Sequence, residues 1–296
     1  MLVPFLSKRS DQQLHRRKGG GKSGGSGGGG RSGGSGSGRG SSRSSPINVG
    51  SGTTKPATSY GFGGGKATTI PSGQLFAGRS AGGGNRDQVF GNRQYGSGYP
   101  GETGRGVSGR GFPFFFWPLA WGGVAGVGTA AYLHNSEYGR FDNTSRPGGI
   151  LMTAAFPSTS ENSTYRVVAD NSTIISLIED IKSNCSSSLE NPDTIEPSTY
   201  NDSLSSPKPE QAVEYYRASS VVLTLDNYNN TGALEAEGTP DTPLPSPIDT
   251  TLLTCLNETI GASVPLVDGA TLHWSAPPSM GLIGLVYLIW SLSSFV

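Results

Sequence analysis

Glycine is distributed so unevenly along this chain that it decides where a packed core can form. Residues 1–111 hold 33 of the 46 glycines in a chain of 296 residues. Glycine loses more conformational entropy on folding than any other residue, and this segment has few apolar side chains whose burial could offset that loss. We therefore predict a mostly disordered Gly-rich N-terminal half, a small α+β domain in the C-terminal half, and an apolar C-terminal helix.

The formal net charge of zero conceals two oppositely charged halves. Residues 1–111 carry 16 of the 22 Lys and Arg residues but 3 of the 22 Asp and Glu residues, a net charge of +13, and residues 112–296 carry −13. A solvated basic arm favours contact with acidic cell-wall polymers or anionic lipid. Its Gly/Ser-rich part, residues 19–45, has no aromatic side chain for base stacking, so we predict no specific nucleic-acid partner.

Shifts in composition divide the chain into six predicted segments. They are a basic Gly/Ser-rich disordered arm (1–58), a Gly/aromatic irregular segment (59–110), an apolar segment (111–133), a glycosylated small α+β domain (134–268), a polar spacer (269–279) and an apolar tail (280–296).

Regular structure is expected in the fourth segment, with two helices and two or three strands. Residues 165–168 are suited to a short strand, and residues 212–226 to one long strand or a hairpin. Apolar residues at steps of three and four predict a helix that is capped by Asn171 or Ser172. A second helix is expected directly after Asp249, a residue type that caps helix N-termini.

Asparagine in this half is concentrated in Asn-x-Ser/Thr sequons, the acceptors of N-glycans. Seven of the ten asparagines from position 143 onward stand in one, whereas composition alone would give roughly two or three. We predict a segment that faces the lumen of the secretory pathway or the cell exterior. The expected glycosylation sites are Asn143, Asn162, Asn171, Asn184, Asn201, Asn229 and Asn257.

The chain has two cysteines, Cys185 and Cys255, separated by 70 residues. In an oxidising compartment such a pair predicts one disulfide, whereas in a reducing compartment the two would be small buried apolar residues. The sequons favour the disulfide, which would link the two predicted helices, since Cys185 ends the first helix region and Cys255 lies within the second.

The C-terminus has the three parts of a glycosylphosphatidylinositol attachment signal. Small residues at 268–270 are followed by a proline-containing spacer (271–279) and a 17-residue apolar tail (280–296). We predict lipid attachment at Asp268 or Gly269, and membrane lipid as a partner through the anchor or the tail. A permanent membrane-spanning tail and a buried core helix remain alternatives, although a span usually needs about 20 apolar residues.

A second apolar run, residues 111–133, contains no charged residue. Arg105 and Arg110 precede it, so it is suited to a signal-anchor that keeps the basic arm in the cytosol and the sequons outside. The alternative is an aromatic-rich segment buried against the C-terminal domain. The first six residues, MLVPFL, are shorter than the 7–15 residues of a signal-peptide core, so they leave both possibilities open.

Residues that carry chemistry are few. The three histidines, His15, His134 and His273, lie too far apart to suggest a metal site. A Ser-His-Asp arrangement would have to use His134, and the sequence has no nucleophile elbow. We predict no catalytic residue, no metal and no cofactor, although a pair of carboxylates of the glycosidase kind stays formally open.

Four blocks of the sequence stand out when they are read together. They are AGRSAGGGNRDQVFGNRQYGSGYPG (77–101), RGFPFFFWPLAWGGVAG (110–126), QAVEYYRASSVVLTLDNYNNT (211–231) and DTTLLTCLNETIGASVPLVD (249–268). They resemble an uncharacterised family of glycine-rich fungal proteins. The resemblance implies a secretory or cell-surface context and implies no activity.

The expected function is that of a non-catalytic, glycosylated cell-surface or wall-associated protein. One alternative is a signal-anchored membrane protein whose basic arm binds acidic partners in the cytosol. A further alternative is an RNA-binding protein that uses its Gly/Arg arm.

Overall fold

The computed structural model describes residues 42–121, 132–133, 136–204, 207–236 and 238–269. All of them belong to one compact unit, Gly38–Val296. The spacer from residue 270, the apolar tail and the three histidines lie outside the described residues, as does the arm up to residue 41.

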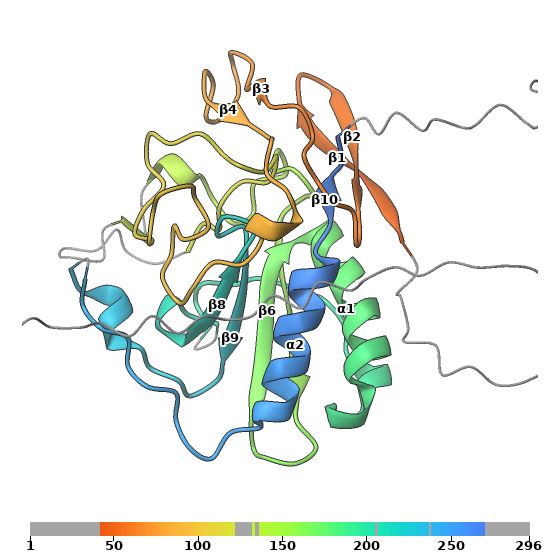
Figure 1. Ribbon diagram of the computed structural model, residues 1–296, viewed down its shortest axis with the longest axis vertical. Helices are drawn as coiled ribbons and strands as arrows, with labels where there is room; N and C mark the ends of the chain where they lie inside the picture. The colour runs from red at the N-terminus through yellow and green to blue at the C-terminus, as the bar shows by residue number, and fades with distance from the viewer. Residues whose placement is uncertain (1–41, 122–131, 134–135, 205–206, 237, 270–296) are drawn as a thin grey trace, which may run out of the picture. The chain divides into compact units, whose positions relative to one another are not determined.

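A five-stranded antiparallel sheet in the order β7-β5-β6-β9-β8 forms the centre of the domain (Figure 1). Its strands are β5 (Leu151–Pro157), β6 (Thr164–Asp170), β7 (Ser198–Thr199), β8 (Ala212–Tyr216) and β9 (Val221–Leu225). Every residue of β9 is buried, which requires cover on both faces of the sheet.

Two helices, α1 (Asn171–Cys185) and α2 (Thr250–Ser263), lie side by side along the sheet (Figure 1). Asp249 caps α2 as predicted, because its carboxylate accepts a hydrogen bond from the Leu252 amide at 2.8 Å. The cap of α1 is Asp170, which accepts from the Thr173 amide at 3.0 Å. The prediction of Asn171 or Ser172 as this cap is therefore wrong by one or two residues.

The predicted disulfide is confirmed. Cys185, the last residue of α1, is bonded to Cys255 in α2, with 5.8 Å between the two Cα atoms. In the chain-entropy model, closing a loop of this length stabilises the folded state by roughly 4 kcal/mol. The two helices are thus joined covalently as well as by packing.

The sheet and helices consist of two similar units. Each unit is a β-hairpin followed by a helix with an aspartate cap, β5-β6-α1 and β8-β9-α2. The hairpins meet through β6 and β9, and this pairing accounts for the strand order. The β8–β9 hairpin is one of the two forms that the sequence allowed for residues 212–226.

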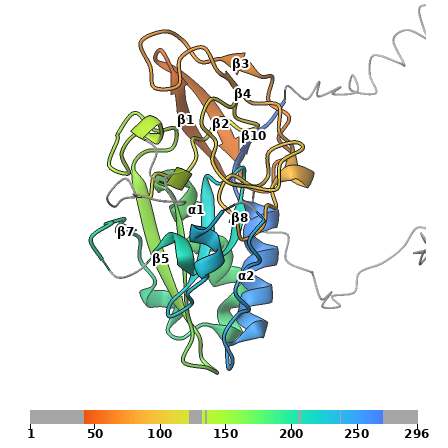
Figure 2. The same cartoon turned by 90° about the vertical axis from the view of Figure 1, so that its left-hand side faces the viewer.

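The second face of the sheet is covered by residues 59–121, which we call the glycine-aromatic layer. Side chains of successive β8 residues alternate between the two faces. Tyr215 packs on Tyr95 of the layer, with 5.8 Å between ring centroids, whereas the Tyr216 hydroxyl donates to Asn257 of α2 at 2.6 Å. Figure 2 views the β5–β7 side of this arrangement.

The layer has little regular structure and is nevertheless packed. It contains the two-residue strands β3 (Thr68–Thr69) and β4 (Ser80–Ala81) and a 3₁₀ helix, Arg86–Gln88. Residues 112, 114–117 and 119–121 are each at most 7% exposed. The described part of the apolar run is therefore buried against the C-terminal domain. No helix among the described residues is long and apolar enough to cross a membrane.

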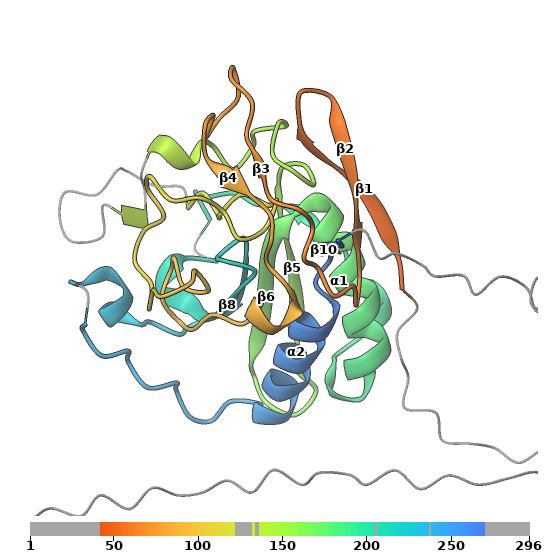
Figure 3. The same ribbon diagram turned by 45° about the horizontal axis from the view of Figure 1, so that its top comes forward.

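The prediction of a disordered arm up to residue 58 is wrong for its last part. The strands β1 (Ser44–Gly50) and β2 (Thr53–Thr58) form a hairpin, and β2 also pairs with β10 (Leu266–Val267) (Figure 3). The hairpin buries Ile47 and Ala57. The second edge of β2 pairs with β10, which lies far from it in the sequence.

Short 3₁₀ helices complete the connections of the C-terminal part. They lie at Ser136–Tyr138, Ser186–Ser188, Pro192–Thr194, Pro209–Gln211 and Thr231–Leu234.

Candidate functional site

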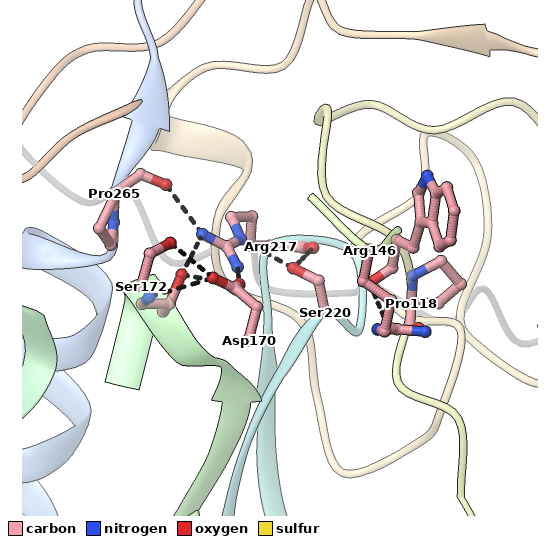
Figure 4. A network of polar contacts seen from close by, with 9 residues as sticks. Pro118, Arg146, Asp170, Ser172, Arg217, Ser220 and Pro265 are labelled. Atoms are coloured by element: carbon pink, nitrogen blue, oxygen red, sulfur yellow. Dashed lines mark hydrogen bonds and ion pairs between the residues drawn. The ribbon is translucent and has the colours of Figure 1, made fainter. Parts of the chain in front are cut away.

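The strongest polar centre in the interior is the guanidinium of Arg217, in the turn between β8 and β9 (Figure 4). It donates to Asp170 Oδ2 at 2.7 Å, to Thr173 Oγ1 at 3.0 Å, to the Pro265 carbonyl at 2.9 Å and to Ser220 Oγ at 2.7 Å. Arg217 is fully buried and Asp170 is 4% exposed. The centre thus joins the turn, the start of α1 and the residue before β10.

The glycine-aromatic layer closes this centre from the other side. The ring centroid of Phe116 lies 3.4 Å from the Arg217 guanidinium carbon, which is a close cation–π contact. Burial lowers the pKa of Arg217 to about 10, and the Asp170 carboxylate opposes that shift. The side chain therefore stays protonated at neutral pH.

A second buried guanidinium, Arg146, serves the backbone of the layer (Figure 4). It donates to the carbonyl oxygens of Trp117 at 3.2 Å and Pro118 at 2.5 Å, and more weakly to that of Tyr138 at 3.4 Å. Burial lowers its pKa to about 10. Irregular backbone leaves carbonyl groups without ladder partners, and this arginine satisfies them.

Arginines from the basic N-terminal half of the sequence bind backbone carbonyls and carboxylates of the C-terminal half. Arg86 donates to the carbonyls of Gly261 at 3.2 Å and Val264 at 2.6 Å, at the C-terminal end of α2 where a cation is favoured. Arg43 bonds Glu179 at 3.0 Å and Asp180 at 2.6 Å. The two oppositely charged halves of the sequence are in part complementary surfaces of one domain.

The Arg217 network is fully paired. Each polar atom of the Arg217 network has a partner within the protein, and Asp170 also accepts from Ser172 Oγ at 2.8 Å. Among the described residues, no group of three or more His, Cys, Asp or Glu side chains is arranged to hold a metal ion.

One carboxyl group of the described residues has a strongly raised pKa. Burial raises the pKa of Glu214, on β8, to about 7, and the charge of Arg93 only partly offsets this effect. A carboxyl group with such a pKa is half protonated near neutral pH, so this position responds to small changes in pH.

All seven sequon asparagines lie among the described residues, and none is buried. Asn162, Asn184, Asn201 and Asn229 are exposed, in the β5–β6 turn, the last turn of α1 and the loops after β7 and β9. The half-exposed ones are Asn143, Asn171 and Asn257.

Asn143 differs from the others because it lines a hollow in the surface. The hollow has a volume of about 200 Å³. Its walls come from the β1–β2 hairpin, the turn at 73–75 and the loop that precedes β5, and Trp117 also lines it. The lining residues are Asn48, Gly50, Gly73, Gln74, Leu75, Trp117, Asn143 and Ser145.

The predicted lipid attachment residues end the described chain beside the layer. Asp268 accepts a hydrogen bond from the Gly63 amide at 2.8 Å, and the Gly269 amide donates to the Gly63 carbonyl at 2.9 Å. A Cβ atom at Gly61 would lie 2.6 Å from the Asp268 carboxylate, so a larger residue there would displace this side chain.

Comparison with known proteins finds no matching family model, curated protein or solved structure. The resemblance to glycine-rich fungal proteins therefore stays a prediction.

Sequence reasoning could identify the sequons and the cysteines because each is a local signal. It missed the Arg217 centre and the hollow, since their residues come from distant segments. The one local hint was Asp170, directly before the apolar residues of α1, where an N-cap residue is expected.

Proposed function

We propose that the protein is a non-catalytic, N-glycosylated cell-surface or wall-associated protein that acts through its surface. The observation that carries this proposal is the Cys185–Cys255 disulfide in a domain whose seven sequon asparagines all reach the surface. Disulfides persist in oxidising compartments, and N-glycans are added in the same pathway.

The surroundings of residues 112–121 weigh against the signal-anchor alternative. Phe116 packs on Arg217, and the Leu119 amide donates to the Ser219 carbonyl at 2.8 Å. A membrane span over 111–133 would have to withdraw these residues and expose the buried Arg217–Asp170 pair. A domain anchored from its C-terminal end keeps them in place.

Attachment of a glycolipid at Asp268 or Gly269 is compatible with the local contacts. Transamidation replaces the peptide bond after the attachment residue with an amide to ethanolamine, so one N–H group is retained. If Asp268 is the attachment residue, that N–H takes the place of the Gly269 amide, which donates to Gly63. The Asp268 side chain keeps its own bond to the Gly63 amide.

Contact with acidic wall polymers or anionic lipid is assigned to the cations before residue 42. The arm up to that point has eight Lys and Arg residues. By contrast, Arg43, Arg79, Arg86 and Arg110 of the described part have partners within the domain.

Treatment of protein from the native host with an N-glycan-removing enzyme tests the secretory proposal. We expect a mobility shift, and free-thiol labelling should find neither cysteine reactive before reduction. Absence of any shift would refute the proposal. A phospholipase specific for inositol lipids should release the protein from membranes, and recovery of C-terminal peptides that include Trp290 from mature protein would refute the lipid anchor.

A further inference from the structure

The hollow beside Asn143 has the chemistry of a site for a neutral sugar. Three residues with carboxamide side chains, Asn48, Gln74 and Asn143, line it together with Ser145. Each carboxamide offers both donors and acceptors, as sugar hydroxyl and acetamido groups require. No described lining residue carries a charge, so the site does not select an ion.

Apolar groups complete the lining. Leu75 and the small exposed part of Trp117, which is 7% exposed, add an apolar lining that C–H groups of a pyranose can contact. Arg146 holds the Trp117 carbonyl at 3.2 Å, so this part of the wall is fixed from the interior. A smaller recess of about 20 Å³ continues the hollow along Asn48, Gly50, Gln74, Trp117 and Ser145.

The size of the hollow suits one ring and not a chain of them. Its volume of about 200 Å³ lies below the range of pockets for drug-sized ligands, roughly 300–1,000 Å³. It is several times the volume that one water molecule occupies in the liquid, about 30 Å³. A single N-acetylhexosamine is a group of intermediate size.

Asn143 supplies such a group at the wall itself, because it is the acceptor of the sequon Asn143-Thr144-Ser145. Its Oδ1 accepts a hydrogen bond from the Ser145 amide at 2.9 Å, and glycan attachment at Nδ2 leaves that bond intact. The covalent linkage keeps the first sugar at a high local concentration beside the hollow, so the sugar stays bound there even if its contacts are weak.

We propose that the first N-acetylglucosamine of a glycan on Asn143 occupies this hollow and links the β1–β2 hairpin to the loop before β5. The inference rests on the proposed function, since it needs the secretory pathway to attach the glycan. It gives this one glycan a structural role, whereas the glycans on exposed turns extend into solvent.

Site-resolved deglycosylation of the native glycoprotein tests the proposal. The enzyme that removes whole N-glycans converts the asparagine to aspartate, so peptide mass spectrometry reports the rate at each site. We expect release from Asn143 to be at least tenfold slower than release from Asn162, Asn201 and Asn229. After denaturation and reduction the four rates should become equal.

Variants of the wall provide the control. Asn48→Ala combined with Gln74→Ala should raise the release rate at Asn143 to that of the exposed sites and leave the others unchanged. The matched control is Thr54→Ala, on the same hairpin but exposed and outside the hollow. Hydrogen exchange of residues 46–50 and 73–75 should slow when Asn143 carries its glycan. Ser145→Ala removes the sequon and should therefore abolish this protection.

The outcomes separate this inference from the proposed function. Release from Asn143 as fast as from Asn162 would overturn the inference, as would an unmodified Asn143 beside occupied exposed sites, and both results leave the proposed function standing. A protein without any glycan would overturn both. Binding of free chitooligosaccharide by unglycosylated protein, lost in the wall variant, together with an unmodified Asn143 would assign the hollow to an external sugar instead.

Discussion

The sheet with its two helices and the glycine-aromatic layer form their cores by different means. In the first, strand ladders and helical turns pair the backbone groups, and periodic apolar side chains fill the space between them. In the second, loop amides and arginine side chains pair the backbone groups. The comparison teaches that a glycine-rich segment can be a folded half of a core when a regular half offers it a surface.

Glycine has a steric task in the layer that explains its abundance there. A Cβ atom at Gly82 would lie 2.6 Å from the Phe115 ring, and one at Gly84 would lie 2.6 Å from the Pro113 carbonyl. The large aromatic side chains therefore pack against bare backbone. The entropy that these glycines lose on folding is offset by the burial of residues 112–121.

Arg217 joins the two parts, so its replacement should have the largest effect. Arg217→Met leaves the Asp170 carboxylate buried without its cation, and we expect a loss of about 3–5 kcal/mol in the free energy of unfolding. Urea unfolding followed by circular dichroism measures it. The matched control, Arg140→Ala, breaks an exposed pair with Asp142 and should leave the unfolding midpoint unchanged. An unchanged midpoint for Arg217→Met would show that the centre contributes nothing to stability.

Removal of the disulfide should weaken the regular half first. Cys185→Ser with Cys255→Ser is expected to lower the free energy of unfolding by about 2–5 kcal/mol, because the unfolded chain regains the freedom of a 70-residue loop. Hydrogen exchange should show α1 and α2 losing protection before β1 and β2. Equal loss in the hairpin would mean that it unfolds together with the helices.

A methyl group in the layer distinguishes steric from conformational roles of glycine. Gly84→Ala forces its Cβ atom against the Pro113 carbonyl, and we expect a loss of about 1–3 kcal/mol. Gly101→Ala meets no atom within 4 Å but has a φ of +77°, so it should lose only about 1 kcal/mol from backbone strain. Thermal unfolding of the two variants compares them, and a larger effect at Gly101 would reverse this assignment.

The smallest expected effect is a pH dependence from Glu214. Its pKa is about 7 in the folded protein and lies near 4.5 when the chain is unfolded, so stability should fall as the pH rises from about 4.5 to 7. Glu214→Gln should remove this decline and raise stability at pH 8 by about 1 kcal/mol, allowing for screening by solvent at this partly exposed group. Melting temperatures at pH 5 and pH 8 measure the change, and equal slopes for both proteins would contradict it.

The regular half could be predicted from local sequence because its signals are local. Asp249 and the apolar residues after it predict α2, and the two cysteines predict their bond. The hairpin of β1 and β2 was missed because only Ile47 and Ala57 give it a buried face. It depends on β10, about 200 residues away, and such pairing leaves no trace in a short window.

The candidate site divides in the same way. Sequons can be identified in any window of three residues, so all seven were available from the sequence. The hollow is assembled from four segments between Asn48 and Ser145, and no spacing rule brings them together. Most of the layer was predicted to be an irregular segment in a mostly disordered N-terminal half because its composition is Gly-rich, while its partner surface lies in the other half of the chain.

The three-stranded sheet determines how the domain would transmit force. Ser44 and Leu266 are both paired with Thr58, so the first strand and the last strand of the described chain flank β2, and these two residues lie two strand spacings apart, about 10 Å. Tension between the preceding and following segments would therefore pass through β1, β2 and β10. The disulfide-linked helices and the central sheet would lie outside that mechanical path, and the hairpin would yield while they stayed folded.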